Sequence, residues 1–178
     1  YAATQRGLED SGLAPENAAN RDEQLPATKT TQYEGGLQWS FPKGQIVLAA
    51  FQIEKPYFSF NEARAFVPLG TRRHRGVEAS FTVHPTDRFD LLAGAYFMEP
   101  EVTGAARDAG LVGKRPAGVP KIFGQLDASY RTDVLGGLTV TGSLVYTGAR
   151  AVTARPIPHL GDRQLTLPGW LSVDLGLR

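Results

Sequence analysis

From about residue 32 to the end of the chain, apolar and polar side chains alternate one by one along most segments. In segment 138–147 the even positions are Leu, Val, Gly, Leu and Tyr, and the odd positions are mainly Thr. Because successive side chains of a strand point to opposite faces, this pattern predicts a strand with one apolar and one mainly polar face. The same period of two recurs in 32–41, 77–84, 121–130 and 167–178, and less cleanly in 45–59 and 89–98.

The connections between these segments alternate in length. Short stretches of turn-forming residues lie at 42–44, 85–87 and 131–137, and longer ones lie at roughly 60–72, 99–119 and 148–166. We therefore expect an all-β, antiparallel up-and-down fold of about seven strands, with tight turns at one end and long loops at the other. Residues 1–30 are polar and lack a sustained period, so we expect a loop there and the sheet domain over 31–178.

An apolar strand face suits either a buried core or the lipid of a membrane. A soluble β-sandwich or a lipocalin-like carrier of a small ligand would turn this face inward. Strands of about 10 residues, however, match the length that a tilted strand needs to cross a bilayer. Short turns at one rim and long loops at the other are typical of outer-membrane barrels.

Aromatic residues near the strand ends favour the membrane alternative. Tyr and Trp prefer the headgroup level of a bilayer, because the ring is apolar and its polar atom favours contact with water. We therefore predict a transmembrane β-barrel whose membrane-interface aromatics are Tyr33, Trp39, Phe41, Phe89, Phe97, Tyr130 and Tyr146.

The composition argues against several kinds of chemistry. The absence of Cys excludes disulfides, thiolate metal sites and a Cys nucleophile. A net charge of +1 gives no support for a nucleic-acid partner. The histidines His74, His84 and His159 are far apart and lack a metal-binding spacing, and the pair Glu99 and Glu101 reads as solvated loop acids. We predict no enzyme activity, no resident metal and no cofactor.

Five short motifs, taken in order, resemble the barrel of the TonB-dependent siderophore receptor family. They are a Pro-containing loop leading into Tyr33-Glu34-Gly35, the strand 46–57, the opening Gly76-Val77-Glu78, the entry Pro120-Lys121-Ile122, and the strand 167–174 with its start Leu167-Pro168-Gly169-Trp170. The resemblance spans nearly the whole chain.

The resemblance implies a bacterial outer-membrane receptor that takes up an iron–siderophore complex with energy from the TonB complex. Its partners would be the ferric siderophore, the TonB complex acting through a plug domain that this chain does not contain, and outer-membrane lipid with lipopolysaccharide. Residues 1–30 and the later long links would be extracellular, and 31–178 would be a C-terminal part of a barrel, incomplete at both ends, since full barrels of this type have about 22 strands. The alternatives are the soluble lipocalin-like carrier, a passive porin or adhesin barrel, and an enzyme in a small barrel.

The densest charge in the chain is the run Arg72-Arg73-His74-Arg75. One interpretation is a solvated strand extension above the membrane that meets lipopolysaccharide phosphates. The other is that one or more of these arginines faces the vestibule and attracts an anionic ferric chelate. On the second interpretation the candidate ligand-binding residues are Arg72, Arg73, Arg75, Arg115 and Arg155.

Overall fold

A computed structural model describes residues 1–178, apart from the side chain of Leu135, and contains one eight-stranded antiparallel sheet and one short ribbon. The sheet strands follow chain order: β1 Ala2–Glu9, β2 Thr28–Phe41, β3 Gly44–Phe60, β4 Phe66–Thr86, β5 Phe89–Thr103, β6 Ile122–Arg131, β7 Thr139–Thr147 and β10 Trp170–Leu177. The ribbon pairs β8 Arg150–Ala151 with β9 Thr166–Leu167. The helical elements are α1 Ala105–Asp108, η1 Val134–Gly136 and η2 Pro158–Leu160. Within the described residues, every helix is too short or too polar to cross a membrane.

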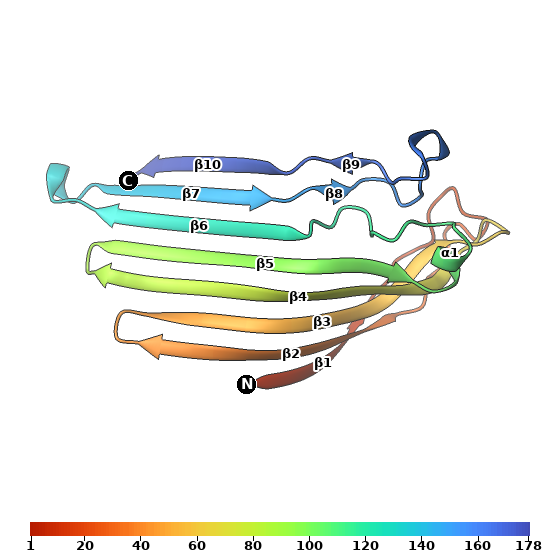
Figure 1. Cartoon of the computed structure of the whole chain (residues 1–178), viewed down its shortest axis with the longest axis horizontal. Helices are drawn as coiled ribbons and strands as arrows, with labels where there is room; N and C mark the ends of the chain where they lie inside the picture. The colour runs from red at the N-terminus through yellow and green to blue at the C-terminus, as the bar shows by residue number, and fades with distance from the viewer.

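The two ends of the sheet differ as the connection lengths predict (Figure 1). The turn end carries the connections 42–43, 87–88 and 132–138, and the loop end carries 10–27, 61–65, 104–121 and 148–169. Two predicted links are too long: β3 and β4 continue into the expected loop 60–72 and leave 61–65 between them, and β5 continues through 99–103 of the expected loop 99–119, so Glu99 and Glu101 are strand residues and not loop acids. Aromatic packing stabilises the extension of β3 and β4, because the rings of Phe58 and Phe66 stack with centroids 5.8 Å apart.

The prediction that residues 1–30 form a loop is wrong for Ala2–Glu9. This segment is β1, which pairs with β2 from Ala2 opposite Gly35 to Glu9 opposite Thr28. Its side chains show little apolar alternation, so the period of two gives no sign of this strand, which backbone hydrogen bonds to β2 hold in the sheet. The expected strand count is therefore one too low for the main sheet.

The strand register gives the sheet an apolar and a polar face. The apolar face carries Leu37 opposite Leu48, and its side chains are open to the surroundings: the exposed fraction is 75% for Leu37 and 85% for Leu175. The polar face carries residues such as Glu78, Asp127 and Asp174. An apolar face this extensive, with no protein layer over it among the described residues, requires an apolar environment.

The buried residues gather at the loop end and not across the sheet. One cluster contains Tyr57, Val102, Ala106 and Val112. Another places Ala14, Ala18 and Leu25 of the 10–27 connection near the aromatic residues Phe58, Phe60 and Phe66. The loops are thus packed onto the strand extensions, and this packing positions the residues described next.

Candidate functional site

A pocket of about 580 Å³ lies among the connections at the loop end, and we call it the loop pocket. Four connections or strand ends that are distant in sequence supply its lining, which consists of Asn17, Phe60, Asn61, Glu62, Arg64, Leu111 and Arg155. Its volume falls within the range of small-molecule sites. Guanidinium, carboxylate, carboxamide, aromatic and aliphatic groups meet there, and the two arginines outnumber Glu62, so the pocket suits a ligand that carries both negative charge and apolar surface.

The tip of the β3–β4 hairpin has a defined geometry that sets the position of Arg64. The Oδ1 atom of Asn61 accepts a hydrogen bond from the backbone N–H of Ala65 at 2.9 Å. Arg64 has φ of +59°, in the left-handed region that non-glycine residues seldom adopt. Its carbonyl accepts from the backbone N–H of Ala19 at 2.9 Å. The hairpin tip is therefore held against the 10–27 connection, with Arg64 at the junction.

Asn20 fixes the same junction from the other side. Its Oδ1 accepts from the backbone N–H of Phe66 at 2.7 Å, and its Nδ2 donates to the carbonyl of Phe66 at 3.2 Å. This side chain therefore replaces a missing strand neighbour for Phe66 and satisfies both backbone groups.

Arg72 lies on the polar face of β4. Its guanidinium carbon is 5.4 Å from the ring centroid of Tyr57, a cation–π contact. Among the described side chains, its Nε and the Nε2 of His74 are buried without a hydrogen-bond partner. Burial lowers the pKa of His74, and the charges of Arg72 and Lys55 lower it further.

Arg73 and Arg75 lie on the opposite side of the sheet from Arg72, so the expectation that one or more of these arginines faces the vestibule concerns Arg72 among the three. The register puts them on the apolar face of the sheet. The Nε of Arg73 donates to Glu54 Oε1 at 2.6 Å, and the Nε of Arg75 donates to Gln52 Oε1 at 2.6 Å. The cause is strand geometry: the run is part of β4, and alternate residues of a strand share a face.

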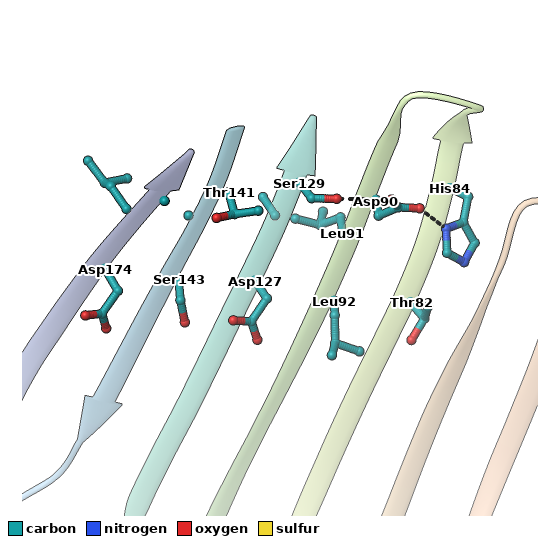
Figure 2. Close-up of a pocket in the computed structure, with 14 residues that line it drawn as sticks. Thr82, His84, Asp90, Leu91, Leu92, Asp127, Ser129, Thr141, Ser143 and Asp174 are labelled. Atoms are coloured by element: carbon teal, nitrogen blue, oxygen red, sulfur yellow. Dashed lines mark hydrogen bonds and ion pairs between the residues drawn. The ribbon is translucent and has the colours of Figure 1, made fainter. Parts of the chain in front are cut away.

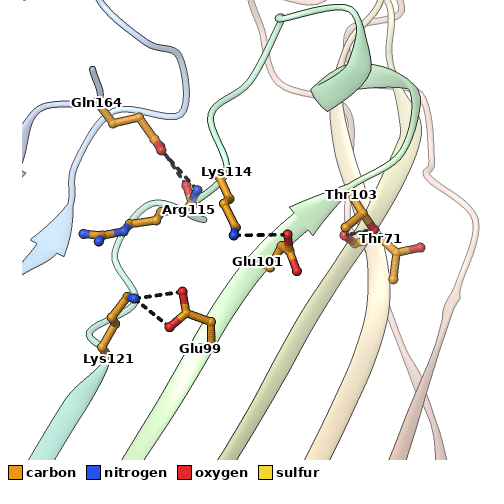
Figure 3. A network of polar contacts seen from close by, with 8 residues as sticks. All are labelled: Thr71, Glu99, Glu101, Thr103, Lys114, Arg115, Lys121 and Gln164. Atoms are coloured by element: carbon orange, nitrogen blue, oxygen red, sulfur yellow. Dashed lines mark hydrogen bonds and ion pairs between the residues drawn. The ribbon is translucent and has the colours of Figure 1, made fainter. Parts of the chain in front are cut away.

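Arg115 lies in the 104–121 connection, where Gln164 holds its backbone (Figure 3). The backbone N–H of Arg115 donates to Gln164 Oε1 at 3.1 Å, and Gln164 Nε2 donates to the carbonyls of Arg115 at 2.7 Å and Thr153 at 2.8 Å. This clamp joins two connections at the loop end. Of the five predicted ligand-binding arginines, the structure places Arg155 in the loop pocket, and sequence reasoning missed Arg64 there.

A second hollow, of about 690 Å³, lies nearer the turn end (Figure 2). Asp127, Ser143 and Asp174 form one row of its lining across three strands. In the next row Asp90 accepts a hydrogen bond from Ser129 Oγ at 3.1 Å and lies 2.5 Å from His84 Nδ1. Among the described residues, no group of three or more His, Asp or Glu side chains is placed to hold a metal ion.

The seven predicted interface aromatics all lie on the apolar face. Tyr33, Phe97 and Tyr146 are on the loop-end half of their strands, and the turn-end half carries Trp39, Phe41, Phe89 and Tyr130. Trp39 has an exposed fraction of 66%, and its ring lies 5.6 Å from that of Phe41. Two aromatic levels on one face agree with the pattern of membrane barrels, and the anchoring role itself stays a prediction.

The sequence is similar to a known family of proteins and to one of its characterised members. The sequence model of a family described as TonB dependent receptor-like, beta-barrel matches residues 1–178. The ferrichrome receptor FcuA of Yersinia enterocolitica is 29% identical over 148 residues, which are 83% of this chain and 18% of that protein. The chain therefore spans less than a fifth of this relative.

Solved structures show the same sheet. The ferric preacinetobactin receptor BauA of Acinetobacter baumannii matches 99% of this chain with 26% of its own, at a TM-score of 0.75 and 30% identity. The ferric yersiniabactin uptake receptor FyuA of Yersinia pestis matches the same shares at a TM-score of 0.76 and 18% identity, which shows the fold alone. The predicted fold class, an antiparallel transmembrane barrel present in part, is confirmed.

Proposed function

This chain belongs to the β-barrel family of TonB-dependent receptors, and we propose that it forms part of an outer-membrane receptor for energy-coupled uptake of a ferric siderophore. Members of this family are outer-membrane receptors and transporters, not enzymes. On this proposal the apolar face meets lipid, the polar face lines the barrel interior, the loop end is extracellular and the turn end is periplasmic.

The observation that carries the proposal is the loop pocket at the expected extracellular end, with Arg64 and Arg155 in its lining. Two cationic groups at a concave mouth raise the local concentration of an anionic ligand. A guanidinium also donates paired hydrogen bonds to carboxylate or phenolate oxygens, which a ferric chelate presents on its surface. Phe60 and Leu111 provide apolar contact for the remainder of such a ligand.

The steps of uptake divide between this chain and parts of the receptor outside it. Residues of the loop pocket would bind and orient the chelate, while iron stays coordinated by the chelator and passes through as substrate. Force from the TonB complex would act on a plug domain, which would release the ligand inward. The backbone of the spanning strands is satisfied by hydrogen bonds between neighbours, as a wall in lipid requires.

The soluble lipocalin-like alternative does not fit the exposure of the apolar face. A soluble carrier would bury residues such as Leu37 and Leu175, whose exposed fractions are 75% and 85%. The alternative of a passive porin or adhesin is disfavoured because the chain belongs to the barrel family of TonB-dependent receptors.

Uptake of radioactive iron by the intact receptor tests the proposal. A strain without its own receptors is supplied with this one and offered a panel of ferric siderophores under iron limitation. We expect at least one to support uptake that depends on TonB, and the double variant R64A/R155A to bind it about tenfold or more weakly, since a hydrogen bond to a charged group contributes about 1.5–3 kcal/mol. R163A, a loop arginine outside the pocket lining, should bind as the wild type does. Absence of uptake with every siderophore would contradict the proposal.

A further inference from the structure

We propose that Asn20 is a positioning residue of the loop pocket, and that its side chain holds the tip of the β3–β4 hairpin so that Arg64 stays in the pocket lining. The proposal rests on the proposed function for the kind of ligand that the pocket binds. Asn20 is not itself one of the described lining residues, so it acts on a ligand only through the hairpin.

The hairpin that carries Arg64 reaches beyond the strands that would support it. The pairing of β2 with β3 ends at Thr31 opposite Glu54, and the pairing of β5 with β4 ends at Thr103 opposite Thr71. Segment 55–70 is therefore a ribbon in which neither strand has a third strand beside it. A two-stranded ribbon is marginally stable by itself, so its tip needs other contacts to keep one position.

The 10–27 connection supplies these contacts through two consecutive residues. The Asn20 carboxamide accepts from the backbone N–H of Phe66 at 2.7 Å and donates to the carbonyl of Phe66 at 3.2 Å. The backbone N–H of Ala19 donates to the carbonyl of Arg64 at 2.9 Å. Three hydrogen bonds thus reach two residues that flank the tip, and together they fix the tip against the connection.

The apolar cluster beneath the tip does not replace these hydrogen bonds. The rings of Phe60 and Phe66 have centroids 5.2 Å apart, and the buried side chain of Leu25 packs in the same cluster. Apolar packing is non-directional, whereas a hydrogen bond requires a narrow range of distance and angle. The packing therefore keeps the hairpin near the connection, and Asn20 determines how the two are aligned.

The conformation of Arg64 indicates that the tip serves its side chain. Its φ of +59° lies where glycine fits without strain and other residues seldom occur. Its backbone is fully engaged, since its N–H donates to the carbonyl of Asn61 at 3.0 Å and its carbonyl accepts from Ala19. The guanidinium is exposed and takes part in none of the ion pairs among the described side chains. An arginine in place of glycine at such a position points to a function for this free cation.

The second arginine of the pocket does not depend on Asn20. Arg155 follows Ala154, whose carbonyl accepts from the backbone N–H of Gly113 at 2.7 Å, so a different connection holds it. Loss of the Asn20 side chain should displace Arg64 and leave Arg155 in place. This difference distinguishes a positioning role from a general loosening of the loop end.

Distances between spin labels in the intact, purified receptor test the position of the tip without a ligand. The labels are attached at A63C in the hairpin tip and at A154C in the 148–169 connection, both exposed positions, and any other cysteine of the receptor is replaced by serine. We expect one narrow distance distribution in the otherwise unchanged receptor, and a distribution about twofold broader or more when N20A is added. E16Q, at an exposed position of the same connection, should leave the distribution narrow.

Binding of a ferric tris-catecholate, a trianionic chelate, tests the consequence for the ligand. We expect R64A to weaken binding about tenfold, and N20A to weaken it by a smaller factor, because a displaced guanidinium loses part of its charge-assisted hydrogen bonds. N20A should have no further effect in the R64A background and its full effect in the R155A background. A merely structural role for Asn20 would weaken binding in both backgrounds.

Two results would overturn the proposal. These are equally narrow distance distributions with and without N20A, and a loss of affinity from N20A that is undiminished in the R64A background. Heat-modifiable migration in electrophoresis shows that each variant is folded. If the chelate does not bind, the label distances decide the role of Asn20. If the receptor also takes up no siderophore while N20A broadens the distribution, the proposed function fails and the positioning of Arg64 by Asn20 stands.

Discussion

Arg72 and Arg73 are adjacent in the chain, yet their side chains lie on opposite faces of β4. Arg72 contacts the ring of Tyr57 on the polar face, and Arg73 pairs with Glu54 on the apolar face at 2.6 Å. One charge run thus serves two environments, which are the barrel interior and the membrane surface in the orientation proposed above.

The variants R72A and R73A should therefore differ in their effect on ligand binding by the intact receptor. R72A removes a cation–π contact, worth about 0.5–1 kcal/mol, and one positive charge from the interior wall, so we expect siderophore affinity to fall severalfold. R73A removes a charge from the apolar face, so we expect siderophore affinity to stay unchanged. Equilibrium titration of both variants with the ferric siderophore measures this, and equal losses in both would contradict the assignment of faces.

The period of two predicted most of the sheet, because burial of one face in an apolar medium forces side chains to alternate. It missed β1, whose pairing with β2 depends on backbone hydrogen bonds that leave no mark on side-chain order. The candidate set Arg72, Arg73 and Arg75 rests on the charge run alone, and alternation along β4 divides these arginines between the two faces of the sheet.

The loop pocket could not be predicted from the sequence. Asn17 and Arg155 are separated by most of the chain and meet because the loops converge above the sheet. No spacing of residues along the sequence predicts that these loops meet in space. The one feature of the sequence that marks Arg64 as a pocket residue is its positive charge in a connection between strands. Other loop arginines share this feature, so the sequence does not distinguish Arg64 from them.

Arginine at the centre of the apolar face should destabilise the barrel. Leu37 lies between the aromatic residues Tyr33 and Trp39 of β2 and has an exposed fraction of 75%. A cation at the bilayer midplane costs about 2–4 kcal/mol, so L37R should lower the free energy of unfolding in lipid vesicles by that order. The control Q38R places the same side chain on the polar face and should cost much less. Equal losses in the two variants, measured by denaturant titration, would show that Leu37 does not face lipid.

The Gln164 clamp should order the loop end. Its side chain makes three hydrogen bonds, each worth about 0.5–1.5 kcal/mol, to the 104–121 and 148–169 connections. We expect Q164A to accelerate hydrogen exchange at the Arg115 amide about tenfold. Q164E should have a smaller effect at this amide, because a carboxylate still accepts from the Arg115 N–H although it cannot donate to the carbonyls of Arg115 and Thr153. H159A, in the same connection, is the control, and unchanged exchange in Q164A would mean that other contacts hold the loops.

Gly113 provides an independent test of the same clamp. A Cβ at this position would lie 2.2 Å from the Gln164 carboxamide, so an added methyl group must displace that side chain. We expect G113A to accelerate exchange at the Arg115 amide as Q164A does. The double variant G113A/Q164A should add little to either single change, since both remove one set of hydrogen bonds. Additive effects would indicate that Gly113 acts through a different contact.

The contact between Glu99 and Lys121 should weaken in acid. Both residues lie beyond the apolar band, and Lys121 Nζ donates to the two Glu99 oxygens at 2.8 and 2.6 Å, which lowers the pKa of this carboxyl below its ordinary 4.5. A carboxyl whose pKa is lower in the folded state stabilises that state fully above its unfolded pKa, and the contribution is lost as pH falls through the folded pKa. At this exposed site it is less than about 1 kcal/mol. Hydrogen exchange in 99–121 should therefore be slower in the wild type than in E99Q above pH 4.5, and the two should converge at lower pH. A difference that grows on acidification would contradict the assigned pairing.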